Sequence, residues 1–445
     1  MKILFFSSNT NQLDTKNFCF SFYPTCKDNF ETLVKNHPDF SFVVVTQKPG
    51  VFLVDLDDGE LNETGKAKNL EYHLLDENIS NEDFAAYIKN LAPDYAISMS
   101  YWLAPLDWLS LNDSLIAEKL KHQNIKTICN SLENQEICFN KWDTQIALES
   151  KGFETPKSIY LSHDLFWAER SNKSIIKNPY KELIFTKLQN MTFPVVIKSL
   201  TGFSSYGMDV AKTFLEALHF LNQKSGNEDK IIQEYKDGFH FGLEIYGDQE
   251  NFEVLPPFLF TLNKYGITSP KQSIKIGPFN FDDEKYQEKL QLSRLKKDME
   301  KLWKTLGFSG SIQVDLVFSE NKWYIIEINP RLSGMTFTYS TLKNSNPQEL
   351  MLKSLVDSNN FPKNQNITLC NLKIPVLSKA DFEKLAQNPM IKRIFQIDNK
   401  LAKQKRDVGF CEIVFEAQNY GELSKVLKLP TLPSENTFFQ DFLAN

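Results

Sequence analysis

Two apolar segments separated by only two residues set the strongest constraint on the fold. They are SIQVDLVFS, residues 311–319, and KWYIIEINP, residues 322–330. Such segments predict two neighbouring strands, and side chains two residues apart on a strand point to the same face. Glu327, Asn329 and Arg331 follow this alternation, so three polar groups leave one face of an otherwise apolar strand. Their common face indicates that these three side chains contribute to one site.

The neighbouring strand adds a second carboxylate to this set. If residues 320–322 form a three-residue turn, Asp315 lies directly opposite Glu327, with Cβ atoms about 4.5–5.5 Å apart. Two carboxylates this close repel each other unless positive charge lies between them. Oxygen ligands from Asp315, Glu327 and Asn329 favour Mg²⁺ or Mn²⁺ over zinc, and Arg331 offers a fixed fork for an oxyanion. The alternative is a salt-bridged surface hairpin, which the period-two placement of Asn329 and Arg331 disfavours.

A segment upstream offers positive charge and small residues for phosphate groups. FPVVIKSLTGFSSYGMD places Lys198 at the end of an apolar strand, and the following loop contains Ser204 and Ser205 with two glycines. Small residues let backbone N–H groups approach phosphate oxygens, and the lysine adds a point charge. Taken alone, such a segment is more often a solvated lysine beside a surface loop.

The next apolar strand also ends in polar residues. In IIQEYKDG, Gln233 and Glu234 stand where free backbone groups can pair with an adenine edge. A plain strand end is the simpler interpretation of that segment by itself. His240 follows in GFHFGLEIYGD, and a single histidine is more often a packed or surface residue than a ligand.

The order of the predicted elements divides the chain. Up to about residue 130, apolar strands alternate with helices, which predicts a parallel sheet covered on both faces. No GxGxxG follows the first strand, so the dinucleotide-binding fingerprint is absent. A small mixed α/β unit comes next, and residues 283–307 predict one long helix. Residues 357–366 are the best linker before a closing subdomain.

Composition limits the classes of function. The 445 residues are 42% hydrophobic, enough for two or three structural units, and the net charge of −6 implies no general affinity for nucleic acid or anionic membranes. No stretch approaches the roughly 20 apolar residues of a membrane span, and MKILFFSSNT is typical of a first strand rather than a leader. Six scattered cysteines without a CxxC pair indicate reduced thiols in a cytosolic protein and disfavour structural zinc. We therefore expect a cytoplasmic protein.

In their order, these elements resemble the ATP-grasp superfamily, and most closely its biotin carboxylase-like branch. The resemblance covers residues 130–334 and is most specific in GSIQVDLVF and YIIEINPR. It implies a mixed α/β ATP-grasp fold. A Rossmann-like preATP-grasp domain would span residues 1–130, and the ATP-grasp domain residues 131–357, with a lid at about 157–235 that clamps ATP. A C-terminal subdomain, residues 358–445, would close it.

The resemblance also implies roles for the matched residues. Metal ligation falls on Asp315, Glu327 and Asn329, and catalysis on Arg331. The residues matched to ATP binding are Lys141, Lys198, Ser204, Ser205, Gln233, Glu234, Tyr235, Lys236 and His240. ATP and two Mg²⁺ or Mn²⁺ ions are the implied cofactors. Because many relatives form dimers, a homodimer is an implied assembly.

The sequence departs from the family where the reaction is decided. The phosphate loop TGFSSYG is bulkier than the usual glycine run. In the segment matched to the family's adenine-binding hinge, residues 233–236, Gln233 replaces an acidic residue. Biotin carboxylases follow this arginine with a Gln-Val-Glu-His stretch that handles bicarbonate, whereas RLSGMTFTYS stands here. EINPRLSG looks more like the carboxylate–amine ligases, including L-amino acid ligases. We therefore expect an ATP-dependent ligase that forms an amide or peptide bond through an acyl phosphate, with amino acids among its carboxylate and amine substrates.

Other interpretations stay open at this point. A carboxylating or formate-activating ligase of the purine or biotin type is disfavoured by the missing bicarbonate stretch. A non-catalytic nucleotide sensor is disfavoured by the complete set of charged site residues. An acceptor pocket is predicted in the insertion before the metal strands, through Lys271 or Lys275, or after the arginine at Ser333, Met335 and Thr336. The two lysines are more often solvated loop charges, and no residue stands out as a general base.

Overall fold

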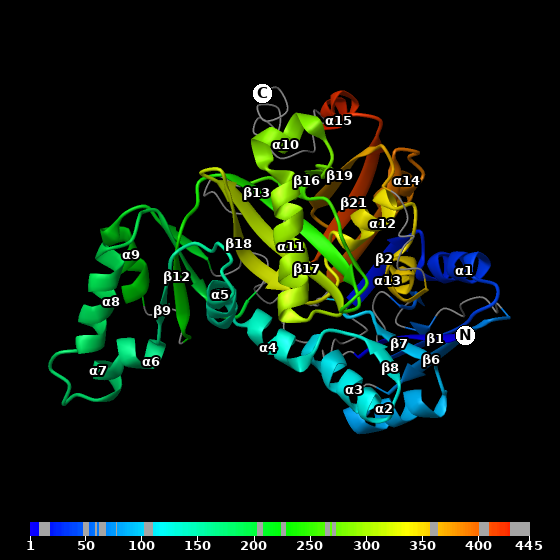
Figure 1. Ribbon diagram of the computed structural model, residues 1–445, viewed down its shortest axis with the longest axis horizontal. Coiled ribbons are helices and arrows are strands. Elements are labelled where there is room, and N and C mark those ends of the chain that lie inside the picture. Colours follow the sequence, from blue (N-terminus) through cyan, green and yellow to red (C-terminus); the bar gives the residue numbers. More distant parts are fainter. Residues whose placement is uncertain are drawn as a thin grey trace.

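Three sheets of at least four strands each organise the described part of the protein in the computed structural model (Figure 1). The structure describes residues 1–8, 18–47, 53–57, 60–61, 68–76, 78–101, 110–202, 208–223, 228–262, 268, 273–356, 364–399 and 409–427. Within these ranges, no helix is both long enough and apolar enough to cross a membrane. Of the cysteine side chains described in the same ranges, all five are free thiols and buried.

The first sheet lies in the N-terminal part and is entirely parallel. Its strands are β1 (Lys2–Ser7), β3 (Ser41–Gln47), β6 (Leu70–Leu75), β7 (Tyr95–Ser98) and β8 (Lys126–Ile128), in the order β6-β3-β1-β7-β8. Helices α1 (Cys26–Asn36), α2 (Asn81–Asn90) and α3 (Leu111–His122) accompany it. Ile3 and Phe5 pack into the core on the α1 side, whereas Leu4 and Phe6 pack with α2 and α3. The predicted parallel sheet with both faces covered is confirmed.

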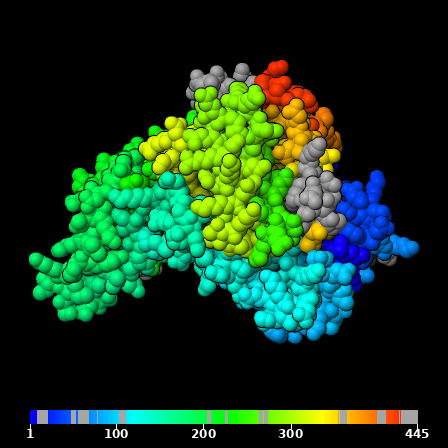
Figure 2. Space-filling model, in the orientation of Figure 1, coloured from blue at the N-terminus to red at the C-terminus, as the bar shows by residue number. Residues whose placement is uncertain are grey.

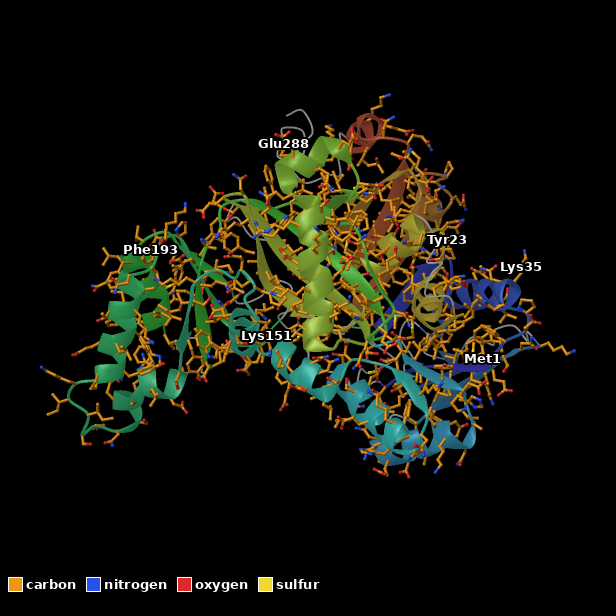
Figure 3. All side chains as sticks on the ribbon, in the orientation of Figure 1. Met1, Tyr23, Lys35, Lys151, Phe193 and Glu288 are labelled. Atoms are coloured by element: carbon orange, nitrogen blue, oxygen red, sulfur yellow. The ribbon has the colours of Figure 1, made fainter. Side chains whose placement is uncertain are left out.

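The second sheet belongs to a lobe that projects from the body of the molecule (Figure 2). It is antiparallel, in the order β11-β10-β12-β9, with strands β9 (Ser158–Leu161), β10 (Val195–Ser199), β11 (Asp209–Ala211) and β12 (Lys230–Glu234). Its helices are α6 (His163–Phe166), α7 (Ala168–Ser171), α8 (Pro179–Gln189) and α9 (Phe214–Asn222). Phe193 lies in this lobe, which we call the lid, and Lys35 lies at the opposite end of the molecule (Figure 3).

The third sheet has ten strands and joins segments from both ends of the chain. Its order is β18-β17-β13-β15-β16-β19-β21-β20-β2, with β14 paired to β13. The strands are β2 (Phe18–Tyr23), β13 (Phe239–Gly247), β14 (Phe252–Val254), β15 (Phe258–Phe260), β16 (Ser273–Gly277), β17 (Gly310–Ser319), β18 (Lys322–Asn329), β19 (Thr368–Ile374), β20 (Ile391–Asn399) and β21 (Phe410–Ala417). C-terminal strands therefore continue the sheet that carries the polar hairpin. The domain boundaries themselves stay predictions.

Helices cover both faces of the ten-stranded sheet. Those packed in the core of one face are α10 (Glu284–Leu290), α11 (Leu292–Leu306), α14 (Lys379–Ala386) and α15 (Tyr420–Leu427). On the other face, α12 (Thr336–Leu342) and α13 (Pro347–Val356) share a core with the parallel sheet. The remaining elements are α4 (Leu132–Phe139), α5 (Lys141–Ser150) and the two-residue strands β4 (Leu56–Asp57) and β5 (Glu60–Leu61).

The single long helix predicted for residues 283–307 is wrong, because the structure divides it into α10 and α11. Gln291 between them adopts the left-handed conformation, with φ at 50°, and this conformation cannot continue a right-handed helix. Leu290 and Leu292 on either side are both fully buried. The break thus lets both leucines enter the core, a tertiary gain that the continuous helical pattern did not reveal.

The hairpin of β17 and β18 differs from the expected geometry at its turn. The turn has two residues rather than three, because Ser319 pairs with Lys322. A register shift follows farther along the hairpin, where Leu316 pairs with Ile325 but Asp315 pairs with Glu327. The skipped residue, Ile326, is a β-bulge, which inserts one extra residue into one strand. The predicted Asp315–Glu327 pairing is confirmed, but the bulge produces it instead of the turn.

The turn itself allows a stability prediction. Glu320 and Asn321 have φ values of 53° and 59°, as in the tight hairpin turns that favour asparagine and glycine. Glutamate is strained in this left-handed region, so Glu320→Asn is expected to raise the free energy of unfolding by about 0.5–1 kcal/mol. Urea denaturation measures this change. Glu320→Gln is the matched control and should leave stability unaltered, because it removes the charge but keeps the backbone preference.

Candidate active site

Strand register gathers polar side chains from three strands on one face of the ten-stranded sheet. Asp315 of β17 pairs with Glu327 of β18 on one side and with Gly242 of β13 on the other. The adjacent row consists of Glu244, Gln313 and Asn329. Paired residues project to the same face of a sheet, so these two rows form a continuous polar surface.

Hydrogen bonds fix the orientation of the two amides in this surface. Arg331 Nη2 donates to Asn329 Oδ1 at 3.1 Å, and Asn329 Nδ2 donates to Gln313 Oε1 at 2.8 Å. Gln313 Nε2 in turn donates to Asp315 Oδ1 at 2.5 Å. Reversing either amide would place two donors or two acceptors together. The relay therefore directs the oxygen of Asn329 toward Arg331 and holds Asp315 in place.

Lysines from two other elements offset the negative charge of the carboxylate pair. Lys141 Nζ at the start of α5 lies 2.8 Å from Glu327 Oε1 and donates to Gly202 O at the same distance. Burial would raise the pKa of Glu327, but Lys141 and Lys198 outweigh it and hold that pKa below its usual value. Burial, followed by the charge of Glu327, raises the pKa of Asp315 to about 6. Burial lowers the pKa of Lys198 to about 8.

The predicted adenine-binding residues lie at the end of β12 in the lid, but two of their backbone N–H groups already form hydrogen bonds. The N–H of Glu234 donates to Lys157 O, and the N–H of Tyr235 donates to Pro194 O, each at 2.9 Å. Neither N–H is therefore free for an adenine edge, contrary to the expectation from the strand end. The buried Gln233 side chain accepts from Lys198 Nζ at 3.0 Å, so it orients that lysine.

Two further predicted ATP-binding residues lie toward the turn end of the β17–β18 hairpin, beyond the metal candidates. Lys236 Nζ lies 4.8 Å from the centre of the Tyr324 ring. His240 pairs in register with Val317, and its buried Nε2 has no hydrogen-bond partner among the described residues. Burial lowers the pKa of His240 to about 4, so its imidazole is neutral at physiological pH.

Three predicted residues lie outside the described residues. Ser204 and Ser205 of the phosphate loop and Lys271 of the insertion belong to this group. Lys275 of the same insertion is described and forms part of β16. The roles predicted for the two serines stay predictions.

The chain beyond Arg331 is anchored by the N-terminal part of the protein. Leu332 N donates to Ser100 O at 3.0 Å, and the Tyr101 hydroxyl donates to Ser333 O. Asn130 Nδ2 donates to Pro330 O at 3.0 Å on the other side of the arginine. The end of β7 and the segment before α4 therefore position the residue predicted to be catalytic.

Sequence reasoning missed several buried polar residues of this face. Gln313 and Glu244 belong to the two rows, and Asn371 and Glu412 lie farther along the sheet in β19 and β21. Each is a polar residue within an otherwise apolar strand. Gln313 also stands two residues before Asp315, so the alternation applied to β18 would have found it.

The oxygen-rich donor set fits a hard divalent cation. Asp315, Glu327 and the oriented amide oxygen of Asn329 present oxygen atoms from neighbouring strands. In the described part of the chain, no three His, Cys, Asp or Glu side chains gather into a metal-binding group. The candidate site therefore rests on two carboxylates and one amide, a set that suits Mg²⁺ or Mn²⁺ completed by phosphate oxygens.

Comparison with known proteins assigns this arrangement to a family. Residues 138–335 match the family model of the ATP-grasp domain. Residues 138–335 therefore resemble an ATP-grasp domain. The match includes the lid, the hairpin of β17 and β18, and the segment after Arg331. The predicted ATP-grasp fold is confirmed, and so is the predicted resemblance to the ATP-grasp superfamily.

Several solved structures share the fold over nearly the whole chain. The L-amino acid ligase from Bacillus licheniformis has a TM-score of 0.61 at 16% identity, covering 96% of this chain and 95% of that protein. The N5-carboxyaminoimidazole ribonucleotide synthetase from Thermus thermophilus has a TM-score of 0.58 at 12% identity, covering 96% and 99%. The biotin carboxylase domain of the Hydrogenobacter thermophilus 2-oxoglutarate carboxylase, solved with MgADP and bicarbonate, gives 0.58 at 12% identity, covering 96% and 88%. Such low identities establish the fold alone.

Curated relatives match a shorter stretch. The carbamoyl phosphate synthase large chain of Clostridium beijerinckii is 21% identical over 221 residues, and that of Clostridium perfringens is 22% identical over the same length. The alignment covers 49% of this chain but 18% of each relative. The chain thus spans less than a fifth of the length of these relatives.

Glu244 is expected to make the free energy of unfolding depend on pH. Burial raises the pKa of Glu244 to about 7, against hydrogen bonds from Ser333, Tyr246 and Thr336 that lower it. The folded protein therefore keeps this proton when the unfolded chain, with a value near 4.5, has lost it. Stability from this group is present below about pH 4.5 and is lost as pH rises to 7, by on the order of 3 kcal/mol.

Urea denaturation between pH 5 and pH 7.5 measures this loss. Glu244→Gln is expected to show a smaller decline than the wild-type protein, because glutamine carries no titrating proton. Equal declines in the two proteins would contradict the raised pKa.

Proposed function

We propose that the protein is an ATP-dependent carboxylate–amine ligase that forms an amide or peptide bond through an acyl phosphate and releases ADP and phosphate. The observation that carries this proposal is the facing pair Asp315 and Glu327, flanked by Lys141 and Lys198 and continued by Arg331. This arrangement places negative ligands for a cation between positive groups for phosphate, as phosphoryl transfer requires.

The metal would be held by Asp315, Glu327 and Asn329. Bound there, Mg²⁺ ions would neutralise charge that develops on the transferred phosphate. The hydrogen-bond relay through Gln313 orients two of these three ligands before any substrate arrives. Pre-oriented ligands need no reorganisation during the reaction, which lowers its barrier.

The first step joins the carboxylate substrate to phosphate. A carboxylate oxygen attacks the γ-phosphorus of ATP, the bond to the β-phosphate oxygen breaks, and ADP leaves. Lys141 and Lys198 lie on the two sides of the interface between lid and body, one on α5 and one on β10. Their charges would hold phosphate oxygens at that interface, and closure of the lid would protect the acyl phosphate from water.

The second step transfers the acyl group to the amine. The amine attacks the acyl carbon, the bond between that carbon and the phosphate oxygen breaks, and inorganic phosphate leaves. The proton that the amine loses passes to phosphate or water. Arg331 Nη1 donates to Leu332 O at 3.1 Å, and with the bond from Nη2 to Asn329 this fixes the guanidinium plane. A fixed guanidinium can stabilise the oxyanion of the tetrahedral intermediate.

The proposal also includes the cofactors and the substrate class that the sequence predicts. ATP and two divalent ions remain the proposed cofactors, and an amino acid is the proposed substrate class on both sides of the new bond. The structural similarity to the L-amino acid ligase from Bacillus licheniformis supports this class. A cytoplasmic location and a homodimer remain predictions.

The metal role of Glu327 is tested by Glu327→Gln. This variant keeps a hydrogen-bonding oxygen for Lys141 but removes the ligand charge, so we expect a folded protein whose ATP turnover falls by at least about 100-fold. Coupled ADP release measures turnover, and thermal unfolding reports the fold. Glu320→Gln, in the turn of the same hairpin, is the control and should turn over normally. Full activity of Glu327→Gln would refute the metal assignment.

The reaction itself is tested by a phosphate-release screen. Purified protein, ATP and Mg²⁺ are mixed with pairs drawn from the common amino acids, small organic acids and bicarbonate. Phosphate release that requires both a carboxylate and an amine is the expected result. Release with bicarbonate alone would instead indicate a carboxylase, and ATP binding without release for any pair would indicate a nucleotide sensor.

A further inference from the structure

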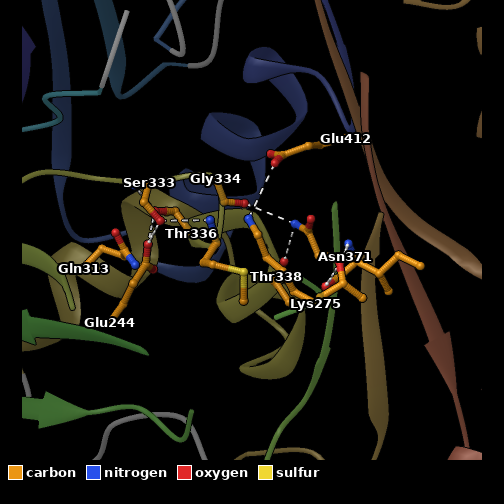
Figure 4. Close-up of polar contacts among 12 residues, drawn as sticks. Glu244, Lys275, Gln313, Ser333, Gly334, Thr336, Thr338, Asn371 and Glu412 are labelled. Carbon is orange, nitrogen blue, oxygen red and sulfur yellow. Dashed lines mark hydrogen bonds and ion pairs between the residues drawn. The ribbon is translucent and has the colours of Figure 1, made fainter. Parts of the chain in front are cut away.

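A second group of buried charges lies on the same sheet face, beyond the residues proposed for ATP chemistry. Lys275 of β16 pairs in register with Asn371 of β19, and Lys373 of β19 pairs with Glu412 of β21. Side chains of Lys275, Asn371 and Glu412 converge on Gly334, three residues after Arg331 (Figure 4). No role in the proposed phosphoryl transfer accounts for this group.

Glu412 approaches Gly334 closely. A Cβ atom on Gly334 would lie 2.9 Å from both carboxylate oxygens of Glu412, so a side chain at this position would displace the carboxylate. Glu412 is 2% exposed, and its Oε1 lies 3.7 Å from Lys275 Nζ. Its Oε2 is buried and has no hydrogen-bond partner among the described residues. Leaving one oxygen of a buried carboxylate unpaired is costly, which indicates that a ligand supplies the donor.

Asn371 presents a second acceptor of the same kind. Its Nδ2 donates to Gly334 O at 3.2 Å and to Thr338 Oγ1 at 2.9 Å, so the amide orientation is fixed. Its Oδ1 is fully buried and lacks a partner within the described part of the chain. Two buried acceptors beside Gly334 therefore favour a ligand group that donates more than one hydrogen bond.

An ammonium group meets this requirement. It carries three donors and no acceptor, and its positive charge complements Glu412. A carboxylate or phosphate in the same place would be repelled by Glu412. Lys275 lies beside this carboxylate and also acts on the pKa of Asp315 and of Glu244, which it lowers, so it stands between the two groups of charges.

We propose that Glu412 and Asn371 hold the ammonium group of an α-amino acid, whose carboxylate lies on the side of Lys275 and Arg331. This inference rests on the proposed ligase function and specifies its carboxylate substrate as a zwitterion. In an α-amino acid the ammonium nitrogen and the carboxylate are separated by one carbon atom. Beyond the larger effect of burial, Glu412 raises and Arg331 lowers the pKa of Tyr101, so both charges lie near the same residue.

The test is the binding of free amino acids to wild-type protein and to Glu412→Gln. Ligand-observed NMR with ADP and Mg²⁺ is applied to the twenty common L-amino acids and to matched carboxylic acids that lack the α-amino group. We expect at least one amino acid to bind the wild-type protein, its des-amino analogue to fail, and Glu412→Gln to bind at least about 10-fold more weakly.

Glu416→Gln is the matched control. Glu416 lies on the same strand, four residues away, and pairs with Lys392 at 3.7 Å. It should bind amino acids as the wild-type protein does. Thermal unfolding and calorimetric titration with ADP and Mg²⁺ establish that Glu412→Gln is folded and that its nucleotide site is intact.

The outcomes separate this inference from the ligase function. Equal amino acid binding by Glu412→Gln, equal binding of the des-amino acids, or no binding of any amino acid to the wild-type protein would each overturn the inference. If phosphate release nevertheless depends on a carboxylate and an amine, the ligase function stands without it. If amino acid binding depends on Glu412 but no pair releases phosphate, the ligase function fails and the subsite stands.

Discussion

The enforced proximity of Asp315 and Glu327 is the constraint on which the rest of the site depends. The hairpin of β17 and β18 pairs the two residues, and the charge of Glu327 helps to raise the pKa of Asp315 to about 6, after the larger effect of burial. Such a pair can persist only with compensation from other elements. Lys141 and Lys198 supply it from α5 and from the lid, so the electrostatics of the hairpin require both parts to meet there.

The ten-stranded sheet extends this chemistry along one face. From the carboxylates at the β18 edge, polar positions continue through Glu244 on β13 and Lys275 on β16 to Glu412 on β21. The distal part of this row is built by the C-terminal strands, and the N-terminal domain fixes the segment beside Arg331 through Ser100 and Tyr101. Both ends of the chain thus shape a site whose metal candidates lie in the middle of the sequence.

Much of the candidate site could be predicted from residues two apart on apolar strands. The alternation of Glu327, Asn329 and Arg331 is a local pattern. It predicted a shared face correctly because Asp315 and Gln313, which pair with Glu327 and Asn329, are also two residues apart. The three-residue turn was wrong because the pairing of the two strands is interrupted by a bulge at Ile326, and no periodicity reveals such a bulge. The continuous helix failed because Gln291 adopts a left-handed conformation that buries the leucines on both sides.

The sequence by itself determined the two strands of the hairpin, the alternation of Glu327, Asn329 and Arg331, and the family resemblance, because each rests on patterns within a few residues or within one hairpin. Only the tertiary structure decided that the N–H groups of Glu234 and Tyr235 are engaged, and that Asn371 and Glu412 converge on Gly334. These contacts join residues from 37 to 78 positions apart, and their geometry depends on how separate strands order themselves within one sheet. That order follows from the packing of whole elements, which no local pattern specifies.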